Sequence, residues 1–178
     1  MMFQDRERHL DLGGLTEDGT PIFERLAQQY LQAMFYIVDP KGKNSLKTTF
    51  PQNLIVTAPK SKDFFGFTID YQIPYTDDFF DDARMDAVLD FMDYTYAPVL
   101  LLRVLREIKR VLQPNSTLTI MDVNHHKGGV IPACKIIGFR NTQMFSFQEL
   151  FESGYPISPQ IEAFHGFGFP VFGLQVTK

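Results

Sequence analysis

The chain has 178 residues and a mass of 20.5 kDa, with 44% hydrophobic and 21% charged residues, which is the composition of an average globular domain. Its 17 Lys and Arg against 21 Asp and Glu leave a net charge of −4 without a basic block, so we expect no nucleic acid as a partner. The longest apolar run, Ala97–Leu102, is too short to cross a bilayer, and the polar N-terminus is unlike a signal peptide. We therefore expect a cytoplasmic protein that does not bind membranes. Cys134 stands alone, which excludes a disulfide framework and a thiolate metal cage.

Short apolar runs rich in β-branched and aromatic residues alternate with helical patterns along the chain. We expect strands at His9–Leu12, Met34–Val38, Asn53–Thr57, Met85–Leu89 and Thr117–Met121. Strands that alternate with helices predict βαβ units and a mostly parallel sheet. Because no repeat, low-complexity stretch or linker divides the chain, we expect one domain over residues 1–178.

The clearest helical pattern covers Pro98–Leu112. Leu101, Leu105 and Ile108 recur there at spacings of four and three. Pro98 suits the first helical position, and the segment Gln113–Ser116 is expected to end the helix in a turn.

Towards the C-terminus a second helix is predicted over Phe147–Glu152. Ser146 and Glu149 form a capping-box pattern at its start. Two final runs, Gln160–His165 and Val171–Thr177, are separated by a short Gly-Phe corner. They are too close for a crossover helix, so we expect them to pair as an antiparallel hairpin.

Several segments carry, in chain order, the motifs of a known family: Leu10–Gly14, Ile37–Asp39, Met85–Asp90 with Leu105–Leu118, and Phe147–Lys178. They resemble the glycine motif, the second strand with its terminal acid, the fourth strand through the fifth, and the closing elements of class I S-adenosylmethionine-dependent methyltransferases. The resemblance implies an α/β fold. It is a doubly wound, mostly parallel seven-stranded sheet with a C-terminal antiparallel hairpin, of the Rossmann-like methyltransferase type.

The resemblance also implies S-adenosylmethionine as the cofactor. In a doubly wound sheet the ligand lies beyond the carboxyl ends of the strands, where the strand order reverses. Gly13 and Gly14 would let backbone N–H groups approach it there, and Asp39 would accept both ribose hydroxyls. The alternatives are a plain tight turn at the two glycines and a simple strand-end residue at Asp39.

Four further positions match cofactor contacts of the family. Asp11 would face the methionine end of the cofactor, and Asp70 matches the acid that contacts adenine. Asp90 and Phe91 would close the fourth strand beside the transferring methyl group. For Asp70, an ordinary position in an irregular stretch is the alternative.

Two histidines, His125 and His126, follow the fifth strand on the ligand side, where one could act as a general base. Adjacent residues on an extended segment point in opposite directions, so at most one is expected to face the pocket. Asp90, Asp122 and Asn124 loosely resemble the Mg²⁺ ligands of catechol-type O-methyltransferases. Because a valine interrupts the Asp-Asn pair, we expect no metal.

Taken with the resemblance, these residues predict in-line methyl transfer from S-adenosylmethionine to a small or medium-sized acceptor. The rival hypothesis is a catalytically inactive methyltransferase-fold binding or assembly module. It follows from the acidic Glu17-Asp18 pair in the glycine loop and from the eight residues before His9, which leave no helices to cover the cleft. We therefore expect a homodimer or a separate protein that supplies the lid.

Overall fold

The computed structural model describes residues 7–15, 21–40, 50–64, 67–89 and 98–178. In chain order its elements are β1 (Arg8–Leu12), α1 (Glu24–Gln29), β2 (Met34–Val38), β3 (Leu54–Thr57), β4 (Lys60–Phe64), β5 (Phe67–Gln72), β6 (Phe80–Asp86), α3 (Pro98–Val111), β7 (Leu112–Val123), the 3-10 helix η2 (Asn124–His126), α4 (Lys127–Ile137), β8 (Arg140–Ser146), α5 (Phe147–Glu152), α6 (Pro159–Gly166) and β9 (Val171–Thr177).

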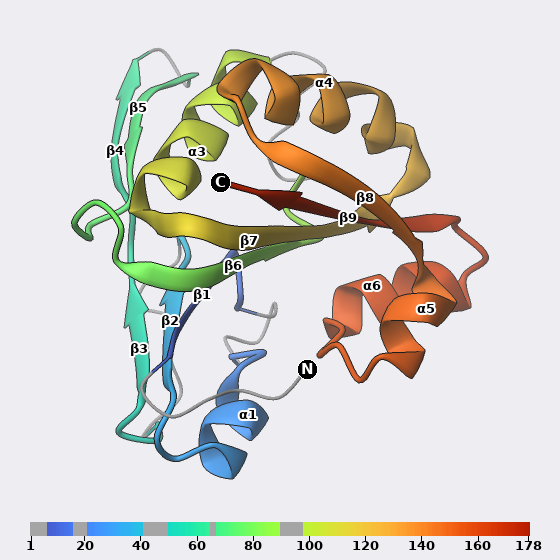
Figure 1. Cartoon of the computed structure of the whole chain (residues 1–178), viewed down its shortest axis with the longest axis horizontal. Helices are drawn as coiled ribbons and strands as arrows, with labels where there is room; N and C mark the ends of the chain where they lie inside the picture. Colours follow the sequence, from blue (N-terminus) through green and yellow to red (C-terminus); the bar gives the residue numbers. More distant parts are fainter. Residues whose placement is uncertain (1–6, 16–20, 41–49, 65–66, 90–97) are drawn as a thin grey trace.

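Seven strands form one sheet in the order β3-β2-β1-β6-β7-β9-β8, and β4 and β5 form a separate antiparallel pair (Figure 1). The neighbours from β3 to β7 are parallel. β9 runs antiparallel to both β7 and β8. The predicted fold class is confirmed, including the seven strands, and the antiparallel C-terminal pair is formed by β8 and β9.

Helices cover both faces of the sheet, with α3 and α4 on one side and α1, α5 and α6 on the other (Figure 1). The sequence of β2 is apolar throughout because successive residues point into two different cores, one on each face of the sheet. Tyr36 and Val38 belong to the core under α3 and α4, whereas Phe35 and Ile37 belong to the core that contains Ala27 of α1.

Helix α3 confirms the predicted amphipathic pattern. Leu101, Leu105 and Ile108 are almost completely buried against the sheet. The predicted turn after the helix takes the form of an irregularity at the start of β7. The pairing with β6 shifts there from Phe80 opposite Leu112 to Asp82 opposite Thr117, and Asn115 has a φ of +66°.

Besides β7, which begins at Leu112 instead of Thr117, two predicted strands differ from the structure. The fourth strand is β6, which begins at Phe80 and ends at Asp86 rather than covering 85–89. The predicted strand Gln160–His165 is wrong, because these residues belong to α6. Ser158 caps that helix by accepting a hydrogen bond from the Ile161 N–H, with proline at the first helical position.

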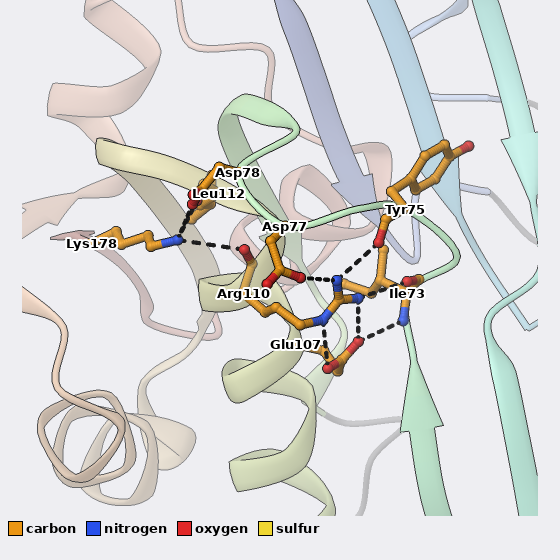
Figure 2. A network of polar contacts seen from close by, with 8 residues as sticks. All are labelled: Ile73, Tyr75, Asp77, Asp78, Glu107, Arg110, Leu112 and Lys178. Atoms are coloured by element: carbon orange, nitrogen blue, oxygen red, sulfur yellow. Dashed lines mark hydrogen bonds and ion pairs between the residues drawn. The ribbon is translucent and has the colours of Figure 1, made fainter.

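A cluster of polar contacts fastens the connection between β5 and β6 to the end of α3. Figure 2 shows the Arg110 guanidinium at its centre, bonded to both carboxylate oxygens of Glu107 at 2.7 and 3.0 Å and to Asp77 at 2.8 Å. It also donates to the carbonyls of Ile73 and Tyr75, so all of its nitrogens are engaged. The Arg110 side chain therefore fixes the β5–β6 connection to α3 through hydrogen bonds to Ile73, Tyr75 and Asp77.

At the other end of the same network, Lys178 bonds to the Leu112 carbonyl at 2.6 Å and to the Asp78 carboxylate (Figure 2).

Within the described ranges no helix has the length and apolar character needed to span a membrane.

Candidate cofactor site at the carboxyl edge of the sheet

The strand order reverses between β1 and β6, which are parallel neighbours at the centre of the sheet. The chain leaves β1 towards β2 and β3 on one side, and it leaves β6 towards β7 on the other. In open α/β sheets this reversal leaves a crevice at the carboxyl ends of the strands, and ligands bind there. The predicted residues Gly13, Gly14 and Asp39 follow or end β1 and β2 at this edge.

Gly13 and Gly14 form a turn that side chains would obstruct. Gly13 has a φ of +73°, and its N–H donates to the Val38 carbonyl at 2.9 Å. A Cβ at Gly13 would stand 2.8 Å from Val88 Cγ2, and one at Gly14 would stand 2.5 Å from Asp11 Oδ2. The turn therefore needs glycine at both positions, for a left-handed backbone at one and a close approach at the other.

Asp39 follows the last residue of β2 and is 5% exposed. Its N–H donates to the Thr57 carbonyl at 3.1 Å, which continues the pairing of β2 with β3 past the end of the strand. Because Gly13 is bonded to the residue before Asp39, the backbone places the glycine turn and this carboxylate next to each other.

Behind the glycine turn lies a buried charge cluster that consists of Asp11, Arg84 and Asp86. Asp11 and Arg84 are paired in register on β1 and β6, and Asp86 is two residues further along β6, so all three share one face of the sheet. Arg84 donates a hydrogen bond to Asp86 Oδ2, and its Nε lies 3.6 Å from Asp11 Oδ2. The cluster holds two carboxylates and one guanidinium.

Arg84 is itself only 4% exposed, and aromatic rings enclose it. Its guanidinium carbon lies 5.2 Å from the centre of the Phe23 ring and 5.1 Å from that of Tyr155. It also donates to the Pro156 carbonyl, and the Tyr155 hydroxyl lies 3.5 Å from Asp86 Oδ1. The segment between α5 and α6 therefore closes over the cluster.

Of the two carboxylates in the cluster, Asp11 has fewer hydrogen bonds than Asp86 among the described residues. It is 0% exposed, and neither oxygen accepts a hydrogen bond from the described residues. Burial raises the pKa of Asp11 from 3.8 to about 7, although Arg84 opposes the shift and Asp86 and Asp39 add to it. Burial also raises the pKa of Asp86, against the attraction of Arg84 and several hydrogen bonds. The cluster therefore favours a bound proton or a further positive charge near Asp11.

A further buried carboxylate, Asp122 of β7, bonds to the segment that follows β6. Its oxygens accept hydrogen bonds from the N–H groups of Leu89 at 3.1 Å and Val123 at 2.8 Å. His126 Nε2 lies 3.7 Å from Asp122 Oδ1, and the His126 ring is 3.8 Å from that of His125, centre to centre. His126 is 5% exposed whereas His125 is exposed. The expectation of an extended segment with the two side chains pointing in opposite directions is wrong, because both residues lie in the 3-10 helix η2 and their rings are neighbours.

The structure brings only some of the predicted residues together. Asp11, Gly13, Gly14 and Asp39 meet at the β1 and β2 ends, and the histidines follow β7. Asp70 is exposed on β5, in the separate β4–β5 pair. The predicted residues Asp90 and Phe91 lie outside the residues that the structure describes.

Sequence reasoning missed Arg84, Asp86 and Tyr155. For the first two a signal was available, because charged residues alternate with Ala83 and Met85 at the strand period. For Tyr155, which joins them from the segment before α6, the sequence offers no comparable signal.

No protein-family model and no curated protein matches the sequence. Solved structures do match. A SAM-dependent methyltransferase from Aquifex aeolicus is similar over 98% of this chain and 84% of its own, with a TM-score of 0.62 and 15% identity. The 16S rRNA methyltransferase KamB matches over 98% of this chain and 88% of its own, with a TM-score of 0.56 and 13% identity. A structure of the complex between the Haloferax volcanii Trm112 methyltransferase activator and a methyltransferase matches over 99% of this chain and 84% of its own, with a TM-score of 0.59 and 12% identity.

These neighbours correct one expectation. No nucleic acid was expected as a partner from the net charge of −4, but an rRNA methyltransferase shares this fold. That expectation was wrong because net charge averages over the whole surface, whereas acceptor contacts depend on local groups.

The structural likeness to the SAM-dependent methyltransferase from Aquifex aeolicus extends over almost the whole of this chain. The chain itself has a seven-stranded sheet whose last strand, β9, runs antiparallel to β7. The chain therefore has the fold of the class I S-adenosylmethionine-dependent methyltransferases.

Proposed function

We propose that the chain binds S-adenosylmethionine at the carboxyl ends of β1, β2 and β6 and transfers its methyl group to an acceptor. The observation that carries the proposal is the combination of the Gly13-Gly14 turn and the Asp39 carboxylate at the point where strand order reverses. When bound, the cofactor supplies an electrophilic methyl group on a positively charged sulfur.

The chemistry of the donor set fits this cofactor. We assign Asp39 to accept hydrogen bonds from two ribose hydroxyls, and the backbone of Gly13 allows a close approach. Asp11 lies beneath Gly14 with two oxygens that accept no hydrogen bond from the described residues. Its negative charge acts from below the turn and favours a positively charged group above it.

For the reaction itself, the chain has to position an acceptor and remove its proton. We assign general-base action to His125, the exposed member of the pair, and a positioning role to His126 with Asp122 beneath it. Asp122 also accepts a hydrogen bond from the N–H of Leu89, three residues past the end of β6, so one carboxylate links the two edges of the proposed acceptor region.

The experiment is calorimetric titration with S-adenosylhomocysteine. Replacing Asp39 with Ala removes charge-assisted hydrogen bonds, and we expect about ten-fold to hundred-fold weaker binding. Asp39→Asn preserves the shape and should also weaken binding. Asp81→Ala, which alters an acid paired with Arg8 at the start of β6, is the matched control and should bind normally. Equal affinity of the Asp39 variants and the native protein would refute the assignment.

We propose a small or medium-sized acceptor. The acceptor screen should include a structured rRNA fragment, because one structural neighbour is an rRNA methyltransferase. Methylation of the RNA alone would contradict the acceptor size but not the cofactor site.

One observation favours the second candidate, an inactive module with this fold. Asp11 is 0% exposed and already has Arg84 as a counter-charge, so a cofactor ammonium would share that carboxylate with Arg84. The same titration separates the two functions, since the inactive module would produce no heat with either form of the cofactor.

A further inference from the structure

The segment from α5 to the start of β9 carries an unusual number of exposed aromatic side chains. Phe151, Phe167 and Phe169 are 57%, 81% and 54% exposed. Together with three ring neighbours they make a surface that we call the aromatic patch: Phe147, Phe151, Phe164, His165, Phe167 and Phe169.

Ring contacts join five of the six members of the aromatic patch, in two groups. Phe147 stacks on His165 with ring centres 4.0 Å apart, and on Phe151 at 6.1 Å. Phe164 meets Phe169 edge-on at 6.2 Å. α5 and α6 lie side by side on the same face of the sheet, with the corner before β9 next to them (Figure 1). The patch is thus one surface contributed by two helices and a corner.

The corner has a defined backbone that holds its phenylalanines in place. The N–H of Phe167 donates to the Ala163 carbonyl, and that of Phe169 donates to the Phe164 carbonyl at 3.0 Å. Gly168 between them has a φ of +82°. Burying a phenylalanine contributes about 1.5–3 kcal/mol, so side chains left exposed on an ordered backbone indicate a surface that another molecule covers.

The charge around the aromatic patch indicates what kind of molecule covers it. From Asn141 to Thr177 the sequence contains no Lys or Arg, while Glu149, Glu152 and Glu162 are exposed on α5 and α6. A rim of this sign repels phosphates and acidic lipid headgroups. It attracts Lys and Arg side chains, which also stack on aromatic faces.

We propose that the aromatic patch is a docking surface for a positively charged protein segment with apolar anchor residues. The anchors cover Phe151, Phe167 and Phe169, and the cations pair with the glutamates. The surface adjoins the carboxyl end of β7, since the Asn124 N–H donates to the Pro170 carbonyl at 2.8 Å. The proposal concerns binding alone and does not depend on methyl transfer.

The test measures fluorescence anisotropy of a short labelled peptide in which Lys alternates with Leu and Phe. Two matched peptides replace Lys with Glu, or Leu and Phe with Ser, and a single-stranded RNA of similar length is the fourth probe. We expect the first peptide to bind the full chain about tenfold more tightly than any other probe. Equal or tighter binding of the acidic peptide or the RNA, or no binding of the first peptide, would overturn the proposal.

Variants then locate the site. The double change Phe167→Ser and Phe169→Ser should weaken binding by about tenfold without affecting folding, because both side chains are exposed. The matched control changes Leu31 in the turn after α1 and Ile136 of α4, exposed by 71% and 72%, to Ser and should bind normally. Glu152→Gln with Glu162→Gln should weaken binding and flatten its salt dependence. An unchanged affinity in the phenylalanine variant, or an equal loss in the control, would show that the patch is not the docking surface.

Discussion

Replacing Asp11 with Asn tests the buried charge cluster directly, because the change keeps the shape of the side chain and removes its ionisation. Asp11 is 0% exposed, and burial raises its pKa from 3.8 to about 7. The folded state thus holds the proton more tightly than the unfolded state. At about 1.36 kcal/mol per pKa unit, the whole shift corresponds to about 4 kcal/mol.

The sign of the pH dependence follows from linkage. Below the unfolded pKa of 3.8, both states are protonated and ionisation costs nothing. As the pH rises from there to about 7, the unfolded state loses its proton first, so the native protein loses stability relative to the variant. Above about 7 both states are ionised and the difference stays constant.

The assay is urea unfolding of the native protein and Asp11→Asn at about pH 5 and about pH 8. We expect the variant to gain about 3 kcal/mol on the native protein between these two conditions, and the constant cost of burying an amide cancels from that difference. Asp70→Asn, at an exposed position on β5, should show no such gain. A variant that becomes less stable relative to the native protein as the pH rises would refute the reasoning, because the ion pair with Arg84 would then dominate over burial.

Three further changes test the fold around the site, each by chemical denaturation. Arg110→Ala should cost about 2–4 kcal/mol because it removes the guanidinium that holds the β5–β6 connection, whereas Arg106→Ala, an exposed change one turn earlier, should stay within about 0.5 kcal/mol. Gly13→Ala should cost clearly more than Gly154→Ala: both have a φ of +73°, but only at Gly13 would the new Cβ meet a side chain, so equal costs would contradict the steric argument. Ser158→Ala should cost about 1 kcal/mol through loss of the α6 cap, and a neutral result would speak against that helix start.

Local sequence patterns predicted those elements in which the periodicity of the apolar residues matches their burial in the fold. The apolar run of β2 is buried on both faces, and α3 has an amphipathic period that matches its buried residues. The capping box at Ser146 and Glu149 formed as predicted, with the side chain of each bonded to the backbone N–H of the other. Such elements can be read from the sequence because each depends on contacts within one turn or one strand.

Helix α4 shows the opposite case. Its sequence contains Gly128, Gly129 and Pro132, which disfavour a helix, and no helix was predicted there. Burial of Val130, Ala133 and Cys134 in the core beneath α3 outweighs that preference. The same core raises the pKa of the Cys134 thiol to about 12, so this side chain acts as a small apolar group.

In the candidate site too, the sequence predicted the residues whose role depends on local geometry and missed those that depend on contacts between distant segments. The glycine turn and Asp39 were recognisable in the sequence because each sits within a residue or two of a strand end, where local backbone geometry decides its role. The pairing of Asp11 with Arg84 across 73 residues was not recognisable, since it depends on the register of two strands. Nor was the closure of the cluster by Tyr155, or the gathering of exposed phenylalanines into one patch. Burial and proximity between distant segments exist only once the sheet has formed, and they set the charge state of the cluster and the surface open to partners.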